Sequence, residues 1–124
     1  MNIESTEFGS ITIDGEKLDH DIVIYPDKIG ERKKEITKEK HGTSHKFTRE
    51  EMEEYLNQVD TEKLRVILIG TGQYGKLGLL DETKRLLEDM GIKSIELKTS
   101  EAVERFEKME ESREEKLGIF HVTC

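Results

Sequence analysis

The sequence predicts one α/β domain, and three observations support this prediction. The chain has 124 residues, enough for one hydrophobic core but too few for a catalytic domain plus a separate cofactor domain. Strand and helix patterns alternate after residue 47, as they do in α/β folds. Residues 66–69 are all apolar, which is typical of a central strand covered on both faces. With no internal repeat or linker, residues 1–124 are expected to form a single domain.

The first 36 residues carry mainly strand signals. Ser10–Ile13 and Glu16–Leu18 flank an Asp-Gly pair, which is the strongest short signal for a β-hairpin. A compact β-branched strand is expected over Asp21–Tyr25. Residues 31–36 are a candidate exposed strand. The chain should therefore open with β-structure.

Three helices are expected in the rest of the chain. The first begins at Thr48, with Glu51 placed to complete a capping box and Phe47 placed to pack on Met52.

The second helix should begin at Asp81, turn Leu86, Leu87 and Met90 inward, and end at Gly91. The third is expected over residues 99–111. Strands are expected over residues 93–97 and 117–122.

Charge and composition exclude several classes of partner. The chain has 28 acidic and 20 basic residues and a net charge of -8, which disfavours nucleic acid and anionic membranes. It has neither a long apolar run nor a signal-peptide pattern, so a soluble, cytoplasmic protein is expected. The single cysteine, Cys124, excludes an internal disulfide. The charged fraction of 39% resembles thermophile proteins.

The stretch GTGQYG at residues 70–75 fits the dinucleotide fingerprint, and with Lys76 it also fits the start of a P-loop. A P-loop needs Ser or Thr after the lysine to bind Mg²⁺, but Leu77 stands there. A dinucleotide site would use Glu96 on the ribose, yet its helix should begin within the motif rather than near Asp81. Neither nucleotide motif is therefore complete.

Two interpretations of this loop remain. On the first, the glycines serve only the backbone of a strand-to-helix connection. Alternatively, amides from Thr71 to Gly75, with Lys76 nearby, bind a small anion or polar ligand. On the second interpretation the candidate ligand-binding residues are Gly70, Thr71, Gly72 and Lys76.

A second polar cluster precedes the Thr48 helix, and its candidate ligand-binding residues are His41, Gly42, Thr43, Ser44 and His45. Its amides and hydroxyls could face an anion at that helix N-terminus. The alternative is a solvated loop with ordinary turn chemistry. Because binding residues concentrate at the ends of elements, we expect a shared pocket between this loop and the 71–76 loop.

The chain end contains a candidate reactive pair, His121 and Cys124. A histidine base can activate a cysteine nucleophile if the fold brings them together. No metal site is expected, because the spacing of the histidines and the cysteine does not suit zinc. Asp19 and Asp21 are expected to be surface or loop caps.

Five segments of the chain resemble, in order and spacing, those of a family of small α/β proteins of unknown function. They are "FGSITIDG", "DHDIVIYPD", "KHGTSH", "LIGTGQYGKL" and the terminal "FHVTC". The resemblance covers nearly the whole chain and is closest to archaeal members. Eukaryotic relatives in this family include an adipogenesis-associated domain-containing protein and a mitochondrial assembly factor for respiratory complex I.

The resemblance implies a mixed β-sheet with helices packed against it and a small additional β-layer from the N-terminal segment. It implies no Rossmann or P-loop enzyme and no established reaction. The shared motif residues are Asp21, Pro26, Gly42, Thr43, His45, Gly70, Gly72, His121 and Cys124. The eukaryotic relatives are richer in tryptophan before the G-T-x-H motif, whereas this chain has no tryptophan.

The leading hypothesis is a non-enzymatic binding, adaptor or assembly protein with a small polar pocket, without a cofactor. Its partner would be an unknown protein or a small polar ligand, and a homo-oligomer is a further option. One alternative is a small enzyme that uses Cys124 with a histidine. The other is weak nucleotide or dinucleotide binding through the loop at residues 70–76.

Overall fold

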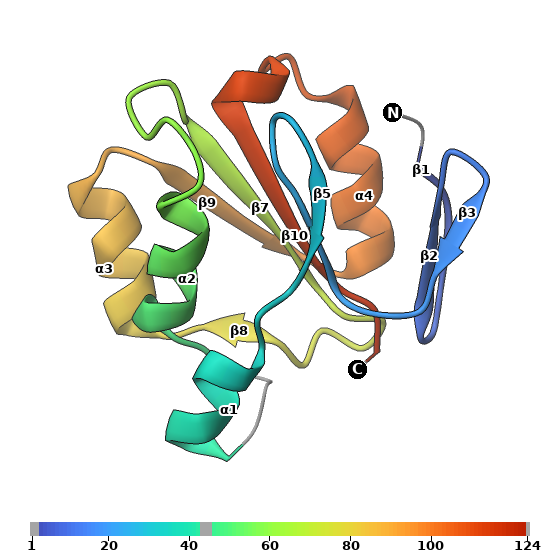
Figure 1. Ribbon diagram of the computed structural model, residues 1–124, viewed down its shortest axis with the longest axis horizontal. Helices are drawn as coiled ribbons and strands as arrows, with labels where there is room; N and C mark the ends of the chain where they lie inside the picture. The colour runs from blue at the N-terminus through green and yellow to red at the C-terminus, as the bar shows by residue number, and fades with distance from the viewer. Residues whose placement is uncertain (1–2, 43–45, 124) are drawn as a thin grey trace.

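The fold is built around strand β7 (Val66–Thr71), whose six residues are all buried. The computed structural model describes residues 3–42 and 46–123. In it, β7 lies in a five-stranded sheet of order β5-β4-β10-β7-β9 (Figure 1). Its neighbours β10 (Lys116–His121) and β9 (Lys93–Leu97) both run parallel to it. The predicted central strand is thus confirmed.

Two further strands make the sheet mixed. β4 (Ile22–Ile24) pairs antiparallel with β10, and β5 (Ile29–Glu31) pairs antiparallel with β4. Because β4 runs against β10, the start of β4 and the end of β5 lie at the same edge as the carboxyl ends of β7 and β10. We call this edge the carboxyl edge of the sheet.

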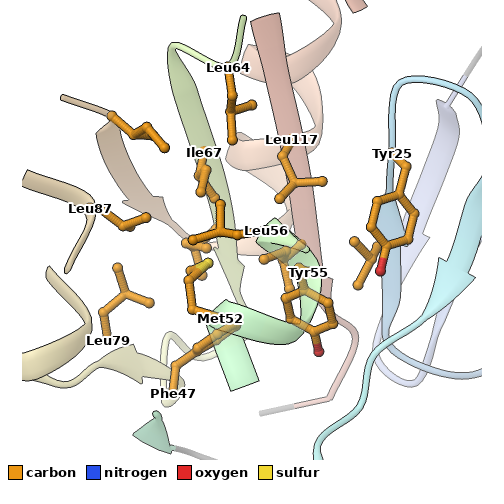
Figure 2. Close-up of a cluster of buried hydrophobic side chains, with 14 of the residues drawn as sticks. Tyr25, Phe47, Met52, Tyr55, Leu56, Leu64, Ile67, Leu79, Leu87 and Leu117 are labelled. Atoms are coloured by element: carbon orange, nitrogen blue, oxygen red, sulfur yellow. The ribbon is translucent and has the colours of Figure 1, made fainter. Parts of the chain in front are cut away.

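Helices α2 (Arg49–Leu56) and α3 (Asp81–Asp89) cover one face of the sheet (Figure 1). Alternate strand residues point to opposite faces, and those of this face form one apolar cluster with the helices. Figure 2 shows Met52 and Leu56 of α2 beside Ile67 of β7 and Leu117 of β10.

Helix α4 (Thr99–Lys108) and a three-stranded antiparallel sheet cover the other face. The strands of this sheet are β1 (Ile3–Glu7), β2 (Ser10–Ile13) and β3 (Glu16–Leu18). Phe106 of α4 packs edge-on against Phe120 of β10, with ring centroids 5.6 Å apart. The small N-terminal β-layer implied by the family resemblance is therefore present, and the predicted α/β class is confirmed.

The predicted hairpin between β2 and β3 is confirmed by its backbone. Asp14 and Gly15 have φ angles of 50° and 82°, the two positive values that a type I′ turn requires. β1, which pairs antiparallel with β2, was not predicted from the sequence.

The expectation of an exposed strand over residues 31–36 is wrong except at Glu31, the last residue of β5. β5 ends at Glu31, and helix α1 (Glu35–His41) follows. A tertiary contact explains why a helix forms here. Thr37 is fully buried against the start of α2, where its hydroxyl contacts Thr48 and Glu51. α1 is a fourth helix, beyond the three expected in the described part of the chain.

The Thr48 cap is confirmed, but its predicted capping box is not. The Thr48 hydroxyl accepts a hydrogen bond from the Glu51 amide at 3.2 Å. The Glu51 carboxylate turns away from the helix end to other buried groups, and the Thr48 amide donates instead to the Thr37 hydroxyl. Glu51 is therefore a residue of the protein interior and not a helix cap.

The later helices differ from expectation only in detail. α3 includes Asp81 as its first residue, but its N-cap is Leu80, without a side-chain cap. Leu87 is buried, whereas Met90 is 39% exposed and does not face inward as expected.

The 3-10 helix η1 (Arg113–Glu115) leads into β10. No helix among the described residues has the length and hydrophobicity to span a membrane.

Candidate functional site

Four polar residues lie next to one another across the carboxyl edge of the sheet. His121 at the end of β10 is in register with Thr71 at the end of β7. Asp21 precedes β4 and contacts His121, and Arg32 follows β5 and donates its amide to the Asp21 carbonyl at 3.0 Å. The ends of four strands thus bring together residues that are far apart in the sequence.

Arg32 lies at the centre of a buried group of charged side chains. Its Nη1 is 3.0 Å from Asp21 Oδ2, and its Nε and Nη2 donate to the two Glu51 oxygens at 2.8 and 3.0 Å. The contact with Glu51 is bidentate, the geometry that makes Arg–carboxylate pairs strong. We call the group formed by Asp21, Arg32, Thr37, Glu51, Tyr55 and His121 the Arg32 cluster.

The Glu51 carboxylate accepts further hydrogen bonds from two hydroxyls. Thr37 Oγ1 donates at 2.6 Å and Tyr55 Oη at 2.7 Å. Since Thr37 gives its only hydroxyl proton to Glu51, Thr48 must be the donor in the 3.0 Å contact between the two threonine hydroxyls. In residues 3–42 and 46–123, every buried side-chain nitrogen and oxygen has a partner, as a stable buried polar network requires.

Asp21 connects the Arg32 cluster to the end of the chain. Its Oδ2 lies 2.7 Å from His121 Nδ1, and its Oδ1 accepts from the Val122 amide at 2.9 Å. An ionised carboxylate can only accept, so His121 Nδ1 carries the proton. His121 Nε2 lies 3.3 Å from the Thr123 hydroxyl. The expectation that Asp21 is a surface cap is wrong.

The pKa of Asp21 reflects these contacts. Burial by itself would raise the pKa, but the hydrogen bond from His121, the Val122 amide and the nearby Arg32 guanidinium outweigh it. The pKa is lowered from 3.8 to about 2. Burial would likewise lower the pKa of Arg32, but Glu51 and Asp21 raise it overall. Both groups therefore stay charged at neutral pH.

Four ionisable members of the Arg32 cluster are closed off from solvent. Asp21, Arg32, Glu51 and His121 expose 4%, 2%, 0% and 2% of their surface. A substrate could not reach these groups in this conformation. The side chains of the Arg32 cluster therefore hold four strand ends and α2 together, and Asp21 orients the His121 ring.

The predicted glycine loop uses its amides within the protein. The Gly72 amide donates to Thr99 Oγ1 at 2.9 Å, Gln73 to the Thr123 carbonyl at 2.7 Å, and Gly75 to the Gly72 carbonyl at 3.4 Å. These three amides are thus engaged rather than directed at an anion. Sequence reasoning missed Thr99, whose hydroxyl also donates to the His121 carbonyl and so ties β7 to β10.

The other predicted residues of this loop have different surroundings. Gly70 lies in β7, and a Cβ there would come within 2.9 Å of both the Phe120 ring and Thr99 Oγ1. Glycine at this position therefore lets the Phe120 ring and Thr99 pack closely against the backbone of β7. The Thr71 hydroxyl donates to the Leu97 carbonyl at 3.0 Å, and Lys76 is exposed.

Glu96, considered above as a ribose-binding acid, has a structural role. Its Oε1 accepts from the Leu79 amide at 2.9 Å, and its Oε2 lies 3.7 Å from Lys84 Nζ. It thereby joins β9 to β8 (Gly78–Leu79) and to α3.

The second predicted polar loop is only partly described. His41 ends α1, and Gly42 follows as an exposed cap, while Thr43, Ser44, His45 and Cys124 lie outside the described residues. β6 (Lys46–Phe47) pairs with β8, and α1, which precedes the second loop, lies on the same side of the domain as β8 (Figure 1). The shared pocket between the two polar loops stays a prediction. No group of three metal-binding side chains occurs in the described parts of the chain.

Sequence reasoning also missed an exposed aromatic pair beside this edge. Phe8 in the β1–β2 turn and Tyr74 in the glycine loop have ring centroids 5.8 Å apart, and they are 58% and 66% exposed. The only available signal was an aromatic residue in each of two turns. Their contact joins segments 66 residues apart and could not be read from the sequence pattern.

Comparisons with known proteins identify relatives of unknown activity. A family described as "Protein of unknown function (DUF498/DUF598)" matches residues 3–121. The crystal structure of the conserved hypothetical protein PH1505 from Pyrococcus horikoshii OT3 is 50% identical, with a TM-score of 0.89 over 100% of both chains. The structure of the protein MT938 is 33% identical, with a TM-score of 0.78 over 98% of this chain and 97% of that one.

More distant structures share the fold alone. An outer membrane protein from Bartonella henselae is 21% identical, with a TM-score of 0.74 over 98% of this chain and 94% of that one. No match was found among the curated proteins.

The Arg32 cluster predicts a specific acid sensitivity. Because the pKa of Asp21 is lower in the folded protein than its ordinary value of 3.8, its stabilisation is complete above about pH 4 and is lost as the pH falls towards 2. The shift corresponds to roughly 2 kcal/mol of the unfolding free energy. Urea unfolding between about pH 6 and pH 2.5 should show this loss in the wild type but not in Asp21→Asn.

Asp19→Asn is the matched control, because Asp19 is an exposed carboxylate two positions away. Its unfolding free energy should follow the wild-type pH dependence. Equal pH slopes for Asp21→Asn and the wild type would show that Asp21 does not carry the effect.

Proposed function

The chain belongs to the family of proteins of unknown function described as DUF498/DUF598, and from this premise we propose that it is a non-enzymatic protein-binding domain, an adaptor or assembly accessory. The proposed binding surface lies beside the carboxyl edge of the sheet. It consists of the β1–β2 turn, the glycine loop and the adjoining end of the chain. We call it the aromatic surface.

The exposed pair of Phe8 and Tyr74 carries the proposal. Both rings are more than half exposed and lie in contact with each other. Aromatic side chains dominate the binding energy of many protein interfaces, and grouped exposed aromatics are more informative than single ones. The two rings would supply the apolar centre of an interface.

The backbone around the two rings is held in place. The Gly9 amide donates to the Val122 carbonyl at 2.7 Å, and the Gln73 amide to the Thr123 carbonyl at 2.7 Å. The Gln73 side chain donates to the Glu7 carbonyl at 3.1 Å. A surface fixed before binding loses less conformational entropy when a partner docks.

A small polar pocket is the second part of the proposal. Gly42 follows α1 and Lys76 precedes β8, and both residues are exposed. Lys76, with the loop that contains Thr43 and His45, would bind a polar or anionic group of the partner beside the aromatic rings. This arrangement would combine an apolar centre with a polar rim, as protein interfaces commonly do.

If the aromatic surface binds a partner, replacing its two aromatic residues should weaken partner binding and leave the fold intact. In Phe8→Ser/Tyr74→Ser, the unfolding free energy should stay within about 0.5 kcal/mol of wild type, because both side chains are exposed. Affinity for a partner should fall at least about tenfold. Quantitative affinity purification from the native cells, followed by binding measurements with the recovered protein, would test this.

Met90→Ser is the matched control, since Met90 is an exposed apolar residue on α3 rather than on the aromatic surface. It should retain the same partner with wild-type affinity. Recovery of the same proteins, with equal affinity, by the wild type and both variants would contradict the proposal.

The orientation of His121 favours a second candidate function, a small enzyme with a cysteine nucleophile. Asp21 holds the proton on His121 Nδ1, and Nε2 is directed at the Thr123 hydroxyl. Cys124 is the next residue in the chain. A histidine oriented by a carboxylate is the usual activator of a nucleophile.

Thiol alkylation separates this candidate from the first. If His121 activates Cys124, the rate of reaction with iodoacetamide should rise with an apparent pKa below about 8.5, and His121→Gln should restore the ordinary value. An ordinary thiol pKa in the wild type would remove the candidate. Nucleotide binding through residues 70–76 has less support, because the Gly72, Gln73 and Gly75 amides already donate within the protein.

A further inference from the structure

A cavity of about 150 Å³ lies at the end of the sheet opposite the carboxyl edge, where β10 begins. Its floor is formed by four buried apolar side chains, namely Ile3, Ile24, Tyr25 and Phe106. Glu107 and Arg113 are exposed and lie at its mouth, and Lys116 is half-buried between floor and mouth. The cavity is therefore apolar inside and charged at its opening.

The Lys116 ammonium lies in a setting that would accommodate an anion. Its Nζ donates to the Phe106 carbonyl at 2.6 Å and lies 4.3 Å from the centroid of the Phe106 ring. Among the described residues, no carboxylate oxygen forms an ion pair with it. Burial lowers its pKa, although Glu107 and Glu111 act against this. An ammonium with three donors thus has hydrogen-bonding capacity left.

The described residues that line the cavity carry two positive charges and one negative charge. Arg113 and Lys116 are cationic and Glu107 is anionic, and the nearby Glu111 carboxylate also acts on Lys116. Glu107 Oε2 is also engaged, since it accepts from the Ile3 amide at 3.3 Å. The two cations therefore lie together at the mouth, although the chain as a whole has a net charge of -8.

The volume limits the size of an occupant. An apolar cavity of about 150 Å³ accommodates one benzene ring. A small ligand site typically combines such an apolar interior with a few polar groups that fix orientation. The occupant that matches both features has a ring-sized apolar body and one negative charge.

We propose that this cavity is a binding site for a small monocarboxylate with an apolar body of about the size of a benzene ring. The carboxylate would bind Lys116 and Arg113 at the mouth, and the apolar body would pack against Ile24 and Phe106. This site is separate from the aromatic surface and does not depend on its proposed role.

Benzoate is the probe that tests the proposal. It is titrated into the full-length protein while the methyl signals of Ile3 and Ile24 are followed by NMR. The chemical shifts of both signals should change and reach a plateau as benzoate is added. The largest chemical-shift changes in the protein should be those of residues that line the cavity. Benzyl alcohol and benzylamine, which keep the ring but not the negative charge, should bind at least about tenfold more weakly.

Lys116→Met keeps most of the apolar stem and removes the charge, so it should weaken benzoate binding at least about tenfold. Lys93→Met is the matched control, since Lys93 is an exposed lysine on β9, and it should bind like wild type. The proposal is overturned if the Ile3 and Ile24 signals do not saturate, if benzyl alcohol binds as well as benzoate, or if inorganic phosphate competes equally. The ligand comparison decides the question even if Lys116→Met does not fold.

Discussion

The structure depends on one buried guanidinium that lies between two carboxylates. Arg32 binds Glu51 through two hydrogen bonds and Asp21 through one, and none of the three side chains is more than 4% exposed. Removing such charges from water costs several kcal/mol each, and only close pairing with full hydrogen bonding offsets this. Any change that removes one charge leaves the others buried without compensation. The Arg32 cluster therefore fixes the relative positions of the segments that contribute its charges.

A continuous series of contacts leads from the Arg32 cluster to the aromatic surface. Asp21 accepts the Val122 amide, and the Val122 carbonyl accepts the Gly9 amide next to Phe8. Thr123, the next residue, accepts the Gln73 amide next to Tyr74. The buried charges thus fix the end of the chain, and the end of the chain fixes the two turns that present the aromatic rings. Stability and the proposed function share the same contacts.

The parts of the fold that were predictable are those with local signals. The Asp14-Gly15 turn, the Thr48 cap and the apolar β7 each follow from residues within a few positions of one another. α1 was missed because the contacts of its buried Thr37 are with Thr48 and Glu51, more than ten positions later in the sequence. Glu51 was interpreted as part of a capping box, since nothing nearby reveals that its partner is Arg32, 19 positions earlier.

The candidate site shows the same division. Sequence reasoning selected His121 and the glycine loop, but it placed Asp21 on the surface because the contact between Asp21 and His121 spans 100 positions. The glycines suggested a phosphate cradle, whereas the structure uses Gly70 for close packing and engages the amides of Gly72 and Gln73 internally. Composition and spacing indicate which residues are unusual, but pairing across the sheet determines what they do.

Amide hydrogen exchange in Arg32→Lys tests whether the Arg32 cluster positions the aromatic surface. Lysine keeps the charge but cannot form the bidentate contact with Glu51. We expect the Gly9 and Gln73 amides to exchange at least about tenfold faster than in wild type, relative to the Leu68 amide in the central strand. Wild-type exchange at Gly9 and Gln73, in a variant that is measurably less stable, would contradict it. The Arg32 cluster would then stabilise the fold without positioning the aromatic surface.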